Sequence, residues 1–547
     1  MSEKRTGGRI LVDNLVAQGC DRIFHVPGES FLAVLDALHD VPAIDVVTCR
    51  QEGGVSFMAC ADGTMTNKPG VAFVTRGPGA TNASIGVHVA MQDSIPMILF
   101  IGDVDRGMRD REGFQEVDFP AFFGPISKWA TRIEDAARIP EYVARAWNVA
   151  QSGRPGPVVI ALPEDMLCDV VESLDRPAVA RVPQAADAEA MTRLAELVAG
   201  AKNPIAIVGG AGWNAETGAD FAAWAERIQL PVATAFRRQD SLPAGSPVFA
   251  GNLGYGPNPK LVQRIKDADL ILAVGARLGE ATTDGYTLVT LDHPGQTLIH
   301  VHPDPNELDR VYRTDLAICA GMASFAQQLA TLDTAGPFAA TQAHAEWIEW
   351  NTPKPRDVIF DLGQCVAAMR ERLPADTIYC NGAGNFSSWW HRYWPYAAYP
   401  SQLAPTAGAM GYGVPAAVAA ALRAPERMVV ALAGDGDFMM NGQEMATAVQ
   451  HGANLLVLVI DNAAYGTIRM HQEREYPARL SGTTLHNPDF AALARAYGGW
   501  AETVERTADF APALDRAMAE TGLRLLHLKT DVEIITAATT ITAIRNR

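Results

Sequence analysis

The chain has 547 residues, more than one hydrophobic core usually holds, so three domains are the natural expectation. Its 48% hydrophobic and 20% charged residues are ordinary for a globular protein. The formal net charge of −17 argues against a nucleic-acid-binding surface, which needs clustered Lys and Arg. The first residues lack the apolar run of a signal peptide, and the most apolar runs are too short to span a bilayer. We therefore expect a cytoplasmic protein that binds neither nucleic acid nor membrane.

Short apolar runs alternate with longer amphipathic ones along the chain, which predicts α/β layering around parallel sheets. The first block has expected strands at 22–26, 43–48, 71–75, 97–101 and 157–162, with a helix at 30–39. The second block has them at 204–208, 231–235, 270–274 and 297–301. The third has them at 377–380, 427–433, 455–460 and 525–529.

Two stretches read as linkers, the Pro- and Ala-rich segment 176–186 and the segment 335–355 with helical pieces. The fold prediction is therefore three doubly wound parallel-sheet domains, at 1–172, 188–335 and 355–547. The seven cysteines form no CxxC pair and are expected to be buried apolar side chains in a reducing compartment.

Two apolar runs of the third block end in side chains that carry oxygen. Gly434-Asp435-Gly436 follows the first run, and Asp461-Asn462 follows the second. The 25 residues 437–461 separate Gly436 from Asn462. The carboxyl ends of parallel strands share one sheet edge, so Asp435 and Asn462 are predicted to lie together, and oxygen ligands suit Mg²⁺. Each motif alone is also typical of an ordinary turn.

This spacing resembles the thiamine diphosphate (ThDP) signature of the acetolactate synthase and pyruvate decarboxylase superfamily. Other motifs match the family in order and spacing over nearly the whole chain: Val26-Pro27-Gly28-Glu29, Arg50-Gln51-Glu52, 77–82, 93–96, Phe114-Gln115-Glu116, 153–157, 408–413 and 487–490. The resemblance implies two ThDP-binding domains that flank a Rossmann-like middle domain. It also implies a homodimer or homotetramer, in which the first block of one subunit meets the third block of another across the cofactor.

Family roles carry over to matching positions. Glu52 corresponds to the carboxylate beside the aminopyrimidine N1′, Met410 to the bulky residue beneath the cofactor, and the Gly408 carbonyl to the acceptor of its 4′-amino group. Taken alone, Glu52 could also be a solvated glutamate in the first turn of a helix. Met410 alone could also be a residue that fills a gap in the core. The resemblance implies further cofactor contacts at Pro27, Asn82, Gly384, Asn385, Gly436, Asp437, Tyr465 and Gly466, and the metal ligands Asp435, Asn462 and Ala464.

The branch of the family is set by fewer residues. Adjacent histidines typical of the decarboxylase branch are absent from the first block, and Gln115 resembles the synthase glutamine that faces the reacting carbonyl. The resemblance therefore implies a Mg²⁺-dependent carboligase that decarboxylates pyruvate or a similar 2-keto acid and ligates the enamine to a second carbonyl. The alternative is a 2-keto acid decarboxylase or acyloin lyase, acting on a keto acid or hydroxyketone. Phe122 and Phe123 suit either a desolvated pocket or the core.

Three segments depart from the synthase pattern. His471 stands where synthases carry a tryptophan, and it either faces the substrate or is solvated on a helix. Arg277-Leu-Gly-Glu280 replaces a flavin-contacting Arg-Phe-Asp-Asp, so FAD is not expected, and the Gly-rich segment 209–212 is explained equally by tight strand–helix packing. Asp461 replaces an asparagine, a change expected to matter least. His88 is either a proton-handling residue near the substrate or a core histidine.

Overall fold

The structure is a computed structural model that describes residues 4–289, 291, 295–334 and 336–546. It comprises two compact units. Unit 1 is Met1–Val182 with Pro405–Pro425 and Met439–Asn454, and unit 2 is Pro183–Ala404 with Glu426–Phe438 and Leu455–Arg547. Three six-stranded sheets, one in unit 1 and two in unit 2, confirm the predicted α/β fold class.

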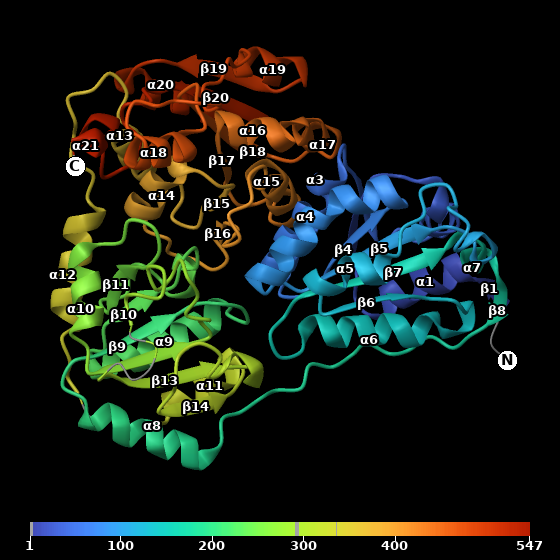
Figure 1. Cartoon of the computed structure of the whole chain (residues 1–547), viewed down its shortest axis with the longest axis horizontal. Helices are drawn as coiled ribbons and strands as arrows, with labels where there is room; N and C mark the ends of the chain where they lie inside the picture. Colours follow the sequence, from blue (N-terminus) through green and yellow to red (C-terminus); the bar gives the residue numbers. More distant parts are fainter. Residues whose placement is uncertain (1–3, 290, 292–294, 335, 547) are drawn as a thin grey trace. The chain divides into compact units, whose positions relative to one another are not determined.

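The first sheet has the strand order β3-β2-β4-β5-β7-β6, and every neighbouring pair is parallel. Its strands are β2 Arg22–His25, β3 Asp45–Thr48, β4 Gly70–Val74, β5 Met97–Asp103, β6 Trp129–Arg132 and β7 Pro157–Pro163. Helices α1 Gly7–Ala17, α2 Leu32–His39, α3 Glu52–Thr66, α4 Gly77–Asp93, α5 Phe119–Phe123, α6 Ile139–Gln151 and α7 Glu164–Cys168 accompany it, and α6 runs along one face (Figure 1). A small antiparallel pair joins β1 Lys4–Thr6 to β8 Val170–Glu172.

The second sheet, in unit 2, has the order β11-β10-β9-β12-β13-β14, again fully parallel. This 3-2-1-4-5-6 arrangement is that of a Rossmann fold. Its strands are β9 Pro204–Val208, β10 Val232–Thr234, β11 Phe249–Asn252, β12 Leu270–Val274, β13 Thr297–His302 and β14 Leu316–Cys319. Its helices are α8 Ala188–Gly200, α9 Ala215–Ile228, α10 Pro259–Lys266, α11 Met322–Ala330 and α12 Ala340–Asn351.

The third sheet, also in unit 2, has the parallel order β16-β15-β17-β18-β20-β19. This order repeats that of the first sheet, so two domains share one topology. Its strands are β15 Ile378–Asn381, β16 Gln402–Leu403, β17 Val429–Gly434, β18 Leu455–Asp461, β19 Trp500–Val504 and β20 Leu523–Lys529. The helices of this part of the chain are α13 Leu362–Arg372, α14 Ser388–Tyr393, α15 Gly413–Arg423, α16 Asp435–Asn441, α17 Met445–Gln450, α18 Gly466–Glu475, α19 Phe490–Ala496, α20 Thr507–Ala519 and α21 Ile541–Arg545.

The strands that the sequence indicated are mainly the central ones. β5, β7, β17 and β18 are buried along their whole length, which is why they read as continuous apolar runs. The strands that sequence analysis missed are short or lie at sheet edges. β6, β14 and β19 are largely exposed or partly exposed, so they give no such run, whereas β11 and β16 are mostly buried but only four and two residues long. The expectation that 157–162 is the last strand of the first block was wrong, because β8 follows it.

The two expected linkers differ in structure. Segment 176–186 has no helix or strand, as expected. The other, of which residue 335 lies outside the described part, is mostly α12, whose Trp347 packs edge-on against Phe249 of β11 at 4.8 Å between ring centroids. The helical pieces of this segment therefore form a packed helix of the second sheet's domain.

Two other expectations concern burial. Within the described residues no helix is both long enough and apolar enough to cross a bilayer. The expectation that all cysteines are buried was wrong for three of them: Cys168 and Cys319 are exposed, and Cys20 is partly exposed. Cys168 ends the short helix α7 and Cys319 ends the edge strand β14, where less of the chain covers a side chain.

Candidate active site

Glu52 is the first residue of α3, at the end of the turn that leaves β3. Its Oε2 accepts a hydrogen bond from Asn82 Nδ2 of α4 at 3.0 Å. Gln51 caps the helix by accepting a bond from the Gly54 backbone N–H at 3.0 Å. Glu52 is partly exposed and bonded on one oxygen only by that amide, so it differs from the freely solvated glutamate that the sequence also allowed.

Pro27 and Gln115 lie at the same edge of the first sheet as Glu52. A Cβ on Gly28, next to Pro27, would lie 2.4 Å from Thr75 Cβ, and one on Gly79 would lie 3.0 Å from Thr75 Cγ2 and 3.5 Å from Glu52 Oε1. These close approaches explain the glycines. Gln115 has φ 64°, and its carbonyl accepts a bond from the Gly77 N–H at 2.9 Å.

A buried carboxylate that the sequence did not single out supports the turn before Glu52. Glu444 is fully buried, and its Oε1 accepts bonds from the backbone N–H groups of Arg50 at 3.1 Å and Gln51 at 3.0 Å. Thr447 Oγ1 donates to Oε2 at 2.5 Å. Burial raises the pKa of Glu444, although these three donors act to lower it. Glu444 therefore fixes the backbone from which Glu52 projects.

The segment that carries Gly408 and Met410 is attached elsewhere in unit 1. Thr406 and Ala407 donate backbone bonds of 2.8 and 3.0 Å to the Asp93 carboxylate, at the last residue of α4. Asn82, the partner of Glu52, lies eleven residues earlier on α4, a separation of about 16 Å along the helix axis. Within one chain, Glu52 and the start of the Met410 loop are thus attached to different parts of α4.

Three other first-block candidates can now be placed. His88 is exposed on α4, so its interpretation as a core histidine was wrong. Phe123 is fully buried, whereas Phe122 is 42% exposed, so one phenylalanine is core and its neighbour is available at the surface of the chain.

In unit 2 the metal candidates come together as predicted from strand ends. β17 ends at Gly434 and α16 begins directly at Asp435, so a helix start replaces the expected turn. The backbone N–H of Ala464 donates to Asp435 Oδ2 and to Asn462 Oδ1, both at 3.2 Å. Ala463 has φ 54°, which turns the loop so that this N–H reaches both side chains. The side-chain oxygens of Asp435 and Asn462 therefore meet at the Ala464 backbone and form one cluster with it.

A second layer of hydrogen bonds holds this cluster. Asn487 Nδ2 donates to Asp435 Oδ2 at 2.7 Å and to Asp461 Oδ1 at 2.8 Å. Asp461 also accepts bonds from Ala463 N at 3.0 Å, His527 Nε2 at 2.8 Å and Lys529 Nζ at 2.6 Å. Asp461, the departure expected to matter least, connects strand β20 to the loop that carries Asn462 through His527 and Lys529. The sequence motif 487–490 gives no sign of this role for Asn487.

The two carboxylates differ in their environments. Burial raises the pKa of Asp435 to about 6, against bonds from Asn487 and Gly436 that lower it. Burial also acts to raise the pKa of Asp461, but hydrogen bonds from His527, Lys529 and Asn487 outweigh it and hold the pKa well below its usual range. Asp461 is thus compensated by the chain itself, whereas Asp435 has no cation to offset its charge among its hydrogen-bond partners in the described chain.

Three glycines beside this cluster lie against aromatic rings so closely that a side chain would not fit. A Cβ on Gly434 would lie 2.8 Å from Phe386 Cδ1, and one on Gly384 would lie 2.6 Å from Phe386 Cε1. A Cβ on Gly436 would lie 2.5 Å from Tyr465 Cε1. The Asp437 carboxylate accepts a bond from Ala383 N at 3.1 Å and lies against Gly382.

Asn385 and Gly466 lie on the same side of this loop. The backbone N–H of Asn385 donates to Thr467 Oγ1 at 3.0 Å, which ties the segment after β15 to the first turn of α18. A Cβ on Gly466 would lie 3.0 Å from Asn462 Nδ2. The predicted diphosphate and metal segments of unit 2 are therefore adjacent. His471 is exposed on α18, five residues beyond Gly466.

The Gly-rich loop after β9 is tightly packed. A Cβ on Gly210 would lie 2.0 Å from the Gly275 carbonyl oxygen, and Trp213 Nε1 donates to the Gly209 carbonyl at 2.7 Å. These contacts support the packing interpretation of the glycines. Arg277 forms an ion pair with the buried Glu307 at 3.3 Å.

Comparison with protein families gives the class. The N-terminal TPP binding domain of thiamine pyrophosphate enzymes matches residues 5–122, the central domain matches 191–329, and the C-terminal TPP binding domain matches 382–528. Thiamine pyrophosphate is another name for ThDP. The N-terminal match covers strands β2 to β5 of the first sheet and the C-terminal match covers β16 to β19 and most of β20 of the third, the two sheets of identical strand order. The central match covers the whole Rossmann-like sheet.

Individual relatives give the branch. The acetolactate synthase large subunit of Lactococcus lactis is 30% identical over 520 residues, covering 91% of this chain and 88% of the relative. The isozyme 1 large subunit of Escherichia coli is 30% identical over 550 residues, covering 96% and 94%. The Corynebacterium glutamicum large subunit is 28% identical over 536 residues, covering 94% and 85%. This chain belongs to the acetolactate synthase-like family of ThDP-dependent enzymes.

Proposed function

We propose that this chain is a Mg²⁺-dependent carboligase that decarboxylates pyruvate or a similar 2-keto acid and joins the remaining fragment to a second carbonyl compound. The observation that carries the proposal is the cluster of Asp435, Asn462 and Ala464 at the ends of β17 and β18. Carboxylate, amide and carbonyl oxygens are the ligands that Mg²⁺ prefers. The described residues hold no group of three or more His, Cys, Asp or Glu side chains suited to a metal ion, so diphosphate oxygens would complete the set.

Glu52 is the proposed proton-handling residue. Asn82 holds one carboxylate oxygen, and Glu444 fixes the turn that precedes it, so the other oxygen keeps a defined direction. When bound, ThDP supplies the electron sink for the carbon from which CO₂ departs. In the proposed site Glu52 would bond the pyrimidine ring, Gly436 and Asn385 would hold the diphosphate, and Met410 would support the rings. Gln115 is the proposed contact to the reacting carbonyl.

A second copy of the chain is the proposed source of the missing half of each site. The resemblance implies that the first block of one subunit meets the third block of another, so we assign Glu52 and the Met410 loop of one chain to different sites. A two-fold dimer pairs Glu52 of each chain with the partner's Met410 loop and metal cluster. The expected result of sedimentation is a dimer or tetramer, and an active monomer would contradict this assignment.

We also propose that the enzyme works without FAD. The space beside the glycines after β9 is occupied by Gly275 and Trp213, and Arg277 forms an ion pair with Glu307. The purified chain should therefore lack flavin absorbance and be fully active without added FAD. Activity that depends on added FAD would refute this part of the proposal.

Product analysis tests the reaction. With pyruvate, ThDP and Mg²⁺, the expected product is a hydroxyketone or acetohydroxy acid. Release of aldehyde alone would reject carboligation and favour the simple decarboxylase, which His471 in place of the synthase tryptophan suggests. Glu52→Gln should lower kcat by about 100-fold or more, in the range typical of acid–base residues, while ThDP still binds. Glu141→Gln, another first-turn glutamate, is the matched control and should leave kcat unchanged.

A further inference from the structure

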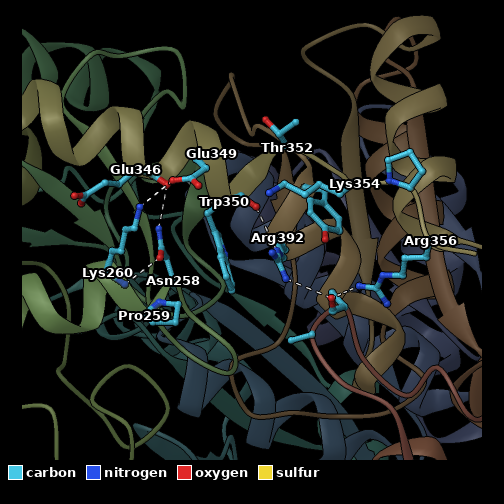
Figure 2. A pocket seen from close by; sticks show the side chains of 14 residues that line it. Asn258, Pro259, Lys260, Glu346, Glu349, Trp350, Thr352, Lys354, Arg356 and Arg392 are labelled. Atoms are coloured by element: carbon cyan, nitrogen blue, oxygen red, sulfur yellow. Dashed lines mark hydrogen bonds and ion pairs between the residues drawn. The ribbon is translucent and has the colours of Figure 1, made fainter. Parts of the chain in front are cut away.

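Unit 2 contains a cavity of about 620 Å³ that uses none of the cofactor-site residues (Figure 2). Its wall comes from the start of α10, the last turns of α12, the segment 352–356 that follows α12, the end of α14 and the loop at Ala537. The volume falls within the range of small-molecule sites, about 300–1,000 Å³. The cavity thus lies where the domain of the second sheet meets that of the third.

The charges that line this cavity are unequal. Its two carboxylates are already paired, Glu349 with Lys260 and Glu346 with Arg264, each at 2.8 Å. Three further cations of the wall, Lys354, Arg356 and Arg392, have no carboxylate within ion-pair distance among the described residues. The whole chain has a net charge of −17, so this group of cations without carboxylate partners is a local positive region on an acidic protein.

The two arginines are held together, as Figure 2 shows. Arg356 Nη2 and Arg392 Nη1 both donate to the Ala537 carbonyl, the latter at 3.3 Å. The Arg392 guanidinium stacks on the Trp350 ring, 3.5 Å from its centroid, and donates to the Trp350 carbonyl at 3.3 Å. Burial, together with the like charge of Arg356, lowers the pKa of Arg392. The Ala537 and Trp350 carbonyls together accept three of these N–H groups, which leaves several donors of the two guanidinium groups for solvent or a ligand.

We propose that this cavity, named here the arginine pocket for Lys354, Arg356 and Arg392, binds a small molecule through a phosphate or diphosphate group. Planar guanidinium groups match phosphate oxygens in pairs, and an ammonium adds a further point charge. Stacking on Trp350 fixes Arg392 before the ligand arrives, which reduces the entropy lost on binding. A ligand here contacts segment 352–356 and α14 together, so it joins the two domains of unit 2.

Calorimetry on the full chain tests the pocket. The enzyme is first saturated with ThDP and Mg²⁺, which fills the cofactor's own diphosphate site, and is then titrated with phosphate, pyrophosphate and ADP. Saturable binding is expected, tighter for pyrophosphate than for phosphate and weaker at high salt. ADP binding more tightly than pyrophosphate would identify a nucleotide, and equal affinity would identify the diphosphate alone; both outcomes support the pocket.

Matched variants locate the binding. Replacing Lys354 and Arg356 by Gln should weaken pyrophosphate binding by about ten-fold or more, as expected for lost charge-assisted hydrogen bonds. Lys260→Gln, in the same cavity but already paired with Glu349, should change affinity by less than about three-fold. A second test uses the wild type, so it does not depend on whether a variant folds. Bound ligand should slow tryptic cleavage after Arg356. Absence of saturable binding to the cofactor-loaded enzyme, or an equal loss in the Lys260 variant, would overturn the proposal.

Discussion

Asn487 offers the sharpest test of how the metal cluster is held. Its amide nitrogen donates to two buried carboxylates, Asp435 at 2.7 Å and Asp461 at 2.8 Å. Asn487→Ala removes both bonds without removing a proposed ligand. The two carboxylates then lose the neutral group that lies between them, and the Asp435 carboxylate loses one of the contacts that set its direction.

The size of the effect follows from these contacts. Hydrogen bonds to charged groups contribute about 1.5–3 kcal/mol each. Asp435 keeps donors from Gly436 at 2.9 Å and Ala464 at 3.2 Å, so its carboxylate should shift rather than swing away. Loss of a residue that orients a metal ligand typically lowers metal affinity by about 10–100-fold. That corresponds to about 1.4–2.7 kcal/mol, the value of one such bond. We therefore expect the Mg²⁺ concentration for half-maximal activity to rise by this factor.

The assay is a Mg²⁺ titration of activity at saturating ThDP, with cofactor binding followed by fluorescence quenching. Asp489→Ala is the matched control, because Asp489 lies in the same loop but only caps α19, accepting a bond from Ala492 N at 3.0 Å. This control should leave the Mg²⁺ requirement unchanged. If Asn487→Ala folds normally and its requirement stays within about two-fold of wild type, the amide bridge does not position the metal site.

Three further outcomes are expected. Glu444→Ala should lower kcat by about ten-fold with little change in KM, because the turn before Glu52 loses buried hydrogen bonds. Glu444→Gln should recover part of the lost kcat. An unchanged kcat in Glu444→Ala would refute the support role. Gly436→Ala should weaken ThDP binding measurably, because its Cβ would lie 2.5 Å from the Tyr465 ring, and normal cofactor affinity would contradict that crowding. Glu473 is buried, and hydrogen bonding from an arginine holds its pKa at about 2, below the ordinary 4.5, so its stabilisation is complete above about pH 4.5 and is lost as the pH falls toward 2. The stability difference between wild type and Glu473→Gln in urea unfolding should therefore shrink over that interval, and a difference independent of pH would exclude this origin.

Sequence patterns predicted those site residues that lie directly after a strand or at the start of a helix. Asp435 and Asn462 each follow a buried strand, and parallel strands bring their carboxyl ends to one edge, so their proximity followed from order alone. Glu52 was found through its motif, since a lone glutamate in a first turn carries no signal. The same reasoning failed for the short edge strands β6 and β19, whose mostly partly exposed residues leave no apolar run.

What the sequence determined by itself is the fold class, the family and the identity of the motif residues, because these depend on local runs and spacings. Tertiary structure alone revealed the groups that hold those residues: Glu444 beneath the turn of Glu52, Asn487 between two carboxylates, and the arginine pocket. Each joins groups that are far apart in the sequence, as the Glu444 carboxylate and the Gln51 backbone N–H are, and no spacing rule encodes such a pair. Chain folding brings them within hydrogen-bond distance, where charge and burial set their roles.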